Sequence, residues 1–132
     1  MDFRHTIFTR QLDLREYEDY LHEILDILKS NEVFEVEMLF GWAWGNEYKN
    51  WTPFITKVEG VPGEIDYANK SGRGSFYDDD TIFFLTDINT EILFCHEHDI
   101  HLSYNEANPI VHSILDAWNA KDLILEKRNA PR

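Results

Sequence analysis

The residues best suited to chemistry lie in one short stretch, "FCHEHDIHLSY", at positions 94–104. Read as a single strand, its side chains alternate between the two faces of a sheet. His96 and His98 then share one face and could supply two zinc ligands, but a zinc site needs a third ligand and usually a fourth. Cys95 and His101 fall on the opposite face. We therefore expect no metal, cofactor or catalytic residue, with metal binding by His96 and His98 as the alternative.

The same alternation argues against a thiolate nucleophile activated by a histidine. Cys95 and His101 are six residues apart, which corresponds to roughly 20 Å at about 3.3 Å per strand residue. At that distance they cannot share a proton, and we expect Cys95 to be a buried structural cysteine. An alternative is a small enzyme or ligand-binding domain with a pocket between the sheet and a helix, in which His101 and Asp99 would transfer protons.

Acidic residues form the second group with a possible function. The net charge is −13, and no Lys or Arg occurs between Arg73 and Lys121. Within this interval "FYDDD", at 76–80, places two aromatic residues before three aspartates, an arrangement suited to anchoring a basic partner. We expect an electrostatic patch for a protein partner. Its expected members are Tyr77, Asp78, Asp79, Asp80, Glu91, Glu97 and Asp99.

Charge and composition exclude several classes of protein. An acidic surface repels phosphates and anionic lipids, so we expect no direct binding to nucleic acid or to membranes. The single cysteine cannot form an intramolecular disulfide, and the N-terminus lacks the basic-then-apolar pattern of a signal peptide. These features predict a cytoplasmic protein.

Hydrophobic periodicity predicts the elements that would position these residues. Helices are expected over 12–31, where Asp13 is a candidate N-cap, and over 109–121, where Asn108 and Pro109 are typical of a helix start. Strands are expected at 3–9, 33–45, 51–60, 81–87 and 91–104, with a further strand or docked tail at 123–128. "VPGE" at 61–64 is interpreted as a turn and 69–80 as a loop.

The order of these elements predicts one α+β domain over residues 1–132, an antiparallel or mixed sheet of about five strands covered by two helices. Trp42 and Trp44 would fill its core, with Glu35 and Glu37 on the other face of their strand.

In overall character, the chain resembles the small acidic immunity proteins of bacterial toxin–immunity systems, including those of contact-dependent inhibition. The features that carry the resemblance are the cation-free block 74–120, "FYDDD" and the 94–104 stretch. The resemblance implies a non-catalytic inhibitor that binds one cognate basic toxin, often a nuclease, and blocks its active site or substrate groove. An acidic adaptor module that docks a basic segment is the remaining alternative.

Overall fold

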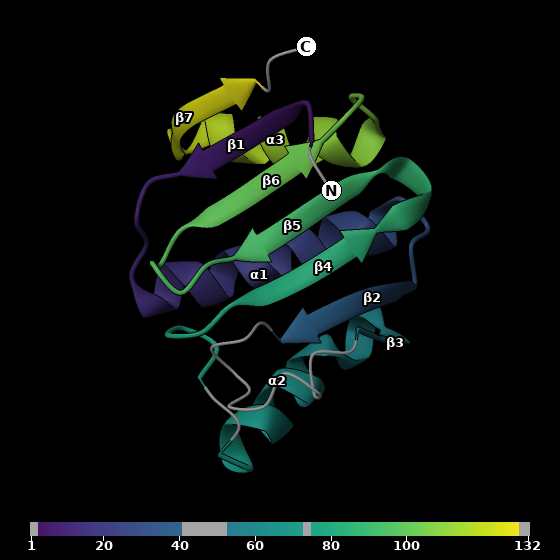
Figure 1. The fold of residues 1–132 in the computed structure, drawn as a ribbon, viewed down its shortest axis with the longest axis vertical. Coiled ribbons are helices and arrows are strands. Elements are labelled where there is room, and N and C mark those ends of the chain that lie inside the picture. The colour runs from purple at the N-terminus through teal and green to yellow at the C-terminus, as the bar shows by residue number, and fades with distance from the viewer. Residues whose placement is uncertain (1–2, 41–52, 73–74, 130–132) are drawn as a thin grey trace.

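The strands of the protein form one antiparallel sheet (Figure 1). The structure is a computed structural model that describes residues 3–40, 53–72 and 75–129. Within these residues the sheet has seven strands in the order β3-β2-β4-β5-β6-β1-β7, and each neighbouring pair is antiparallel. The strands are β1 (His5–Thr9), β2 (Glu35–Phe40), β3 (Phe54–Lys57), β4 (Thr81–Leu85), β5 (Thr90–Phe94), β6 (Ile100–Tyr104) and β7 (Ile124–Asn129).

The two longest helices cover one face of the sheet. Figure 1 shows α1 and α3 together behind the strands, whereas α2 lies at the end of the sheet formed by β2 and β3. Of the helices described, none is both long and apolar enough to cross a lipid bilayer. The helices are α1 (Leu14–Ser30), α2 (Val61–Lys70) and α3 (Pro109–Ala120), with short 3-10 turns η2 (Val58–Gly60) and η3 (Thr86–Ile88).

Helix α1 begins at the N-cap that the sequence predicts. The Asp13 carboxylate accepts a hydrogen bond from the backbone N–H of Glu16 at 2.9 Å, and the Glu16 side chain accepts one from the Asp13 N–H at 3.2 Å. This reciprocal capping box satisfies two N–H groups that have no partner within the helix. Asn108 caps α3 in a similar way, accepting from the Val111 N–H at 3.0 Å.

The hydrophobic core lies between the sheet and its helices. Alternate residues of β4, β5 and β6 are buried there, including Phe83, Ile92 and Leu102. They face the buried stripe of α1 and the fully buried Trp118 of α3. The same alternation holds in β2, where Val36, Met38 and Phe40 are buried as predicted.

The α+β class is confirmed, but the predicted numbers of strands and helices are wrong. The stretch 91–104 forms two strands, because residues 95–99 turn the chain between β5 and β6. The stretch 61–64 begins α2, whose buried residues Val61, Ile65 and Ala68 recur at helical spacing. The described residues therefore hold seven strands and three α-helices. The tryptophans at 42 and 44 lie outside the described residues.

The capping box gives a direct test of what starts α1. Replacing Asp13 with Ala should lower the free energy of unfolding by about 1 kcal/mol, because the Glu16 N–H loses its acceptor. Asp19→Ala, an exposed change within the same helix, is the control and should leave stability nearly unchanged. Urea unfolding of both variants measures the difference; equal midpoints would show that the capping box does not stabilise α1.

Candidate functional site at the β5–β6 turn

The candidate site is built on the five-residue turn Cys95–Asp99. The turn is closed by two backbone hydrogen bonds, from the Cys95 N–H to the Asp99 carbonyl and from the His98 N–H to the Cys95 carbonyl, both at 2.9 Å. His98 has a φ of 74°, a left-handed conformation that a residue with a side chain rarely adopts. The turn therefore has a defined and slightly strained backbone.

Hydrogen bonds from the N-terminal part of the chain hold this turn in place. The Tyr17 hydroxyl of α1 donates to the Cys95 carbonyl at 2.9 Å. The Leu12 N–H donates to the His98 carbonyl at 2.8 Å, and the Gln11 amide donates to the Glu97 carbonyl at 3.2 Å. Because Tyr17 is fully buried, its bond to Cys95 is shielded from water.

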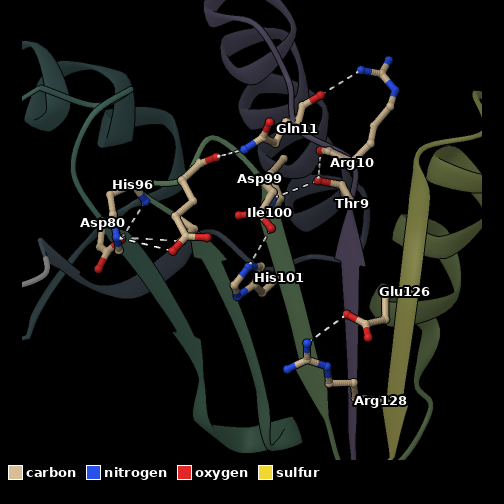
Figure 2. Close-up of polar contacts among 12 residues, drawn as sticks. Thr9, Arg10, Gln11, Asp80, His96, Asp99, Ile100, His101, Glu126 and Arg128 are labelled. Atoms are coloured by element: carbon tan, nitrogen blue, oxygen red, sulfur yellow. Dashed lines mark hydrogen bonds and ion pairs between the residues drawn. The ribbon is translucent and has the colours of Figure 1, made fainter.

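A histidine–aspartate pair ties the turn to the segment before β4. Asp80 Oδ1 accepts from the His96 backbone N–H at 2.7 Å and lies 2.8 Å from His96 Nδ1, as Figure 2 shows. The hydrogen bond to Asp80 raises the pKa of His96 above its usual value. Only 13% of the Asp80 side chain is exposed, so its carboxylate mainly interacts with His96 of the turn and has little contact with solvent.

His98 makes a second contact with the same acidic segment. Its ring stacks on Tyr77, with the ring centroids 3.8 Å apart and the planes 3° from parallel, and its Nε2 lies 3.4 Å from Asp78 Oδ1. The Tyr77 hydroxyl donates to the Leu12 carbonyl at 2.8 Å. Both ends of the Tyr77 side chain are thus engaged within the protein, although the residue is only half-buried.

Asp79 folds back on its own loop. Its carboxylate accepts from the Ser75 N–H at 2.8 Å, and its own N–H donates to the Ser75 carbonyl at 3.0 Å. Burial raises the pKa of Asp79, although the Ser75 hydrogen bond opposes this shift. Asp79 therefore stabilises the conformation of residues 75–79 and also adds negative charge to this segment.

A second histidine–aspartate pair begins β6. His101 Nε2 lies 3.0 Å from Asp99 Oδ2, and these side chains are 21% and 17% exposed (Figure 2). Desolvation is the largest single influence on Asp99 and opposes its ionisation, but the hydrogen bond and electrostatic attraction from His101, together with weaker contributions from neighbouring groups, outweigh it and hold the pKa of this carboxyl below its usual value. The Cys95 sulfur, the Asp99 carboxylate and a His101 ring nitrogen all lie within 4.8 Å of one another. The predicted separation of Cys95 from His101 by roughly 20 Å is therefore wrong, because the turn folds the chain back on itself.

The Cys95 thiol is nevertheless poorly suited to nucleophilic catalysis. The residue is 6% exposed, and burial raises the pKa of its thiol to about 12. A nucleophilic cysteine reacts as the thiolate, which this environment disfavours at neutral pH.

Most of the acidic residues expected in the patch meet at this end of the sheet. Asp78 contacts His98 and Asp80 contacts His96, which brings the 78–80 segment close to Glu97 and Asp99; Asp79 lies between them and bonds to Ser75. Asp78 and Glu97 are the most exposed of these, at 70% and 71% of their side-chain surface. The sequence did not indicate that His96 and His98 would contact Asp80 and Asp78.

Glu91 is the exception among the expected patch residues. It lies within β5, where its register partners are Phe84 of β4 and Ser103 of β6. It is half-buried, and desolvation raises the pKa of its carboxyl. Glu91 therefore lies in the middle of the sheet, apart from the acidic residues that gather at the Cys95–Asp99 turn.

The cavities of the described part of the molecule include three that lie away from the turn. One of about 580 Å³ is lined by polar residues that include Arg4, Asn89 and Asn105. One of about 370 Å³ lies between Val33, Phe84 and Ile110, and one of about 430 Å³ lies beside Phe34 and Lys57. Neither Asp99 nor His101 lines any of these cavities, so they do not provide a pocket in which this pair could act on a substrate.

The raised pKa of Glu91 predicts how stability depends on pH. The pKa of Glu91 is higher in the folded state than in the unfolded state, so protonation of Glu91 favours folding. This stabilisation is complete below the unfolded pKa of about 4.3 and is lost as the pH rises through the folded pKa. Glu91→Gln should therefore raise Tm at pH 7 by about 2 °C or more, and this increase in Tm should vanish at about pH 3. Glu106→Gln, an exposed acid with the same charge change, is the control. Thermal unfolding at both pH values measures this; an unchanged or lowered Tm at pH 7 would contradict it.

Comparisons with known proteins give no assignment for this chain. No protein-family model, no curated protein and no solved structure matches it. Its function must therefore be inferred from its own residues and their geometry.

Proposed function

We propose that this chain is a non-catalytic, immunity-type inhibitor that binds a cognate basic protein, such as a toxin nuclease domain, through the acidic end of its sheet. We define this acidic end by Asp78, Asp79 and Glu97 together with the supporting residues Asp80 and Asp99. The observation that carries the proposal is the approach of two acidic segments, 78–80 and 97–99, at one place, with the Asp78 and Glu97 carboxylates exposed.

The charge distribution supports a basic partner. The block 74–120 contains no Lys or Arg, and it supplies β4, β5, β6 and the turn between the last two. Carboxylates gathered there produce a negative field that attracts cationic surfaces and speeds their association. A groove that holds nucleic-acid phosphates has the complementary positive charge.

The rigidity of the acidic end also supports a binding role. Asp80 and Tyr77 are held by hydrogen bonds to the turn and to Leu12, and His98 is stacked against Tyr77. A surface that is already ordered loses little conformational entropy when a partner binds, which favours affinity. The partly buried acids Asp80 and Asp99 are engaged with His96 and His101 and need not touch the partner themselves.

The enzyme alternative has weaker support from the geometry. Asp99 and His101 form a hydrogen-bonded pair, but both side chains are mostly buried and neither lines a described cavity. An acidic adaptor would use the same surface as an inhibitor, so the two differ in whether binding stops an activity of the partner.

The first experiment identifies the partner and tests inhibition. The tagged chain is used to capture proteins from its native cells at low salt, and the bound material is eluted with high salt. The proposal predicts one stoichiometric basic protein that salt releases, whose toxicity or nuclease activity the purified chain suppresses. A partner whose activity is unaffected would support the adaptor, and the absence of any salt-sensitive partner would contradict the proposal.

Charge removal then tests the acidic end. The double variant Asp78→Asn, Glu97→Gln should weaken binding to that partner roughly tenfold at low salt, because two exposed carboxylates are lost from the contact. The control, Asp116→Asn with Glu106→Gln, removes the same charge from exposed positions on α3 and on the loop before it. Titration calorimetry measures both affinities; equal losses in the two variants would show that only net charge matters.

A further inference from the structure

The turn also brings together three different metal-binding atom types. The Cys95 sulfur, a carboxylate oxygen of Asp99 and a ring nitrogen of His101 lie within 4.8 Å of one another. We propose that these three side chains bind one Zn²⁺ ion. The inference rests on this geometry and does not depend on the proposed function.

The donor set suits zinc better than a harder cation. Zn²⁺ binds Cys sulfur at about 2.3 Å, His nitrogen at about 2.0–2.1 Å and carboxylate oxygen at about 2.0–2.2 Å. Ca²⁺ and Mg²⁺ prefer oxygen ligands alone. A mixed sulfur, nitrogen and oxygen set therefore selects a borderline transition metal, and water can complete the tetrahedron.

An unsatisfied oxygen on Asp99 gives an independent reason to place a cation here. Asp99 Oδ2 is paired with His101, but Asp99 Oδ1 is closed off from solvent and has no hydrogen-bond partner among the described residues. A buried carboxylate oxygen without a partner is costly. A bound Zn²⁺ ion would supply the missing positive charge.

A second group, Asp80, Cys95 and His96, has the same spacing but is the weaker candidate. Asp80 Oδ1 already interacts with two nitrogens of His96, its backbone N–H and its Nδ1. The His96 side chain is also 47% exposed, against 21% for His101. Zinc at either position would displace a histidine–aspartate hydrogen bond, but of these two aspartates only Asp99 also offers a buried oxygen without a partner.

Zinc binding requires small shifts and the release of protons. Two ligands of a tetrahedral zinc ion lie about 3.4–3.6 Å apart, so any pair near the 4.8 Å limit must close by about 1 Å. The Cys95 thiol proton and any proton on the His101 nitrogen that faces the metal leave to solvent. The metal then takes the place of the Asp99–His101 hydrogen bond and links the start of the turn to the first residues of β6.

Cobalt titration of the wild-type chain is the primary test. After chelation and removal of the chelator, Co²⁺ should produce one equivalent of binding with a thiolate-to-cobalt charge-transfer band and the visible bands of tetrahedral coordination. Adding Zn²⁺ should abolish these bands and raise Tm, because the ion binds the folded state preferentially. Absence of the charge-transfer band would overturn the proposal without requiring any variant to fold.

Substitutions then assign the ligands. Cys95→Ser should remove the charge-transfer band, and both Cys95→Ser and His101→Gln should weaken Zn²⁺ binding by at least about tenfold. His112→Gln, an exposed histidine of α3, is the matched control and should leave binding unchanged. Circular dichroism confirms that each variant is folded. Loss of binding in His96→Gln but not in His101→Gln would assign the ion to the Asp80 side and contradict the proposed ligand set.

Discussion

The hydrogen bond from the buried Tyr17 hydroxyl to the Cys95 carbonyl is the interaction on which the acidic end of the sheet most depends. It fixes the start of the β5–β6 turn against α1, and the bond from Leu12 to His98 fixes its far side. Asp80 then joins the turn to the segment before β4. With the turn fixed in this way, the carboxylates of two separate segments hold defined positions although they repel one another.

The parts of the fold that the sequence predicts correctly are those with strong local signals. Asp13 and Asn108 cap their helices through short-range hydrogen bonds, so the residue type alone indicates where α1 and α3 begin. The alternation in β2 correctly identifies its buried face. Helix α2 was missed because Pro62 and Gly63 favour a turn, although a proline is compatible with the first turn of a helix.

The site was harder to predict because it depends on where one strand ends. A continuous strand over 91–104 would place His96 and His98 in the same row as the buried Phe94 and Ile100, which would require two imidazoles in the core. That conflict was a usable signal for a turn at 95–99. The pairing of Asp80 with His96, and the approach of Cys95 to His101, follow only from the turn and from β4 lying beside β5. Periodicity along the chain carries no information about such contacts.

We propose above all that the acidic end of the sheet recruits a basic partner electrostatically. The most direct measurement is the association rate constant with the captured partner, determined by stopped-flow mixing over a range of ionic strength. Electrostatic recruitment should give a steep fall in the association rate constant as salt rises, with a dissociation rate constant that changes little, because salt screens the attraction between separated charges. An association rate constant that does not change with salt would contradict it.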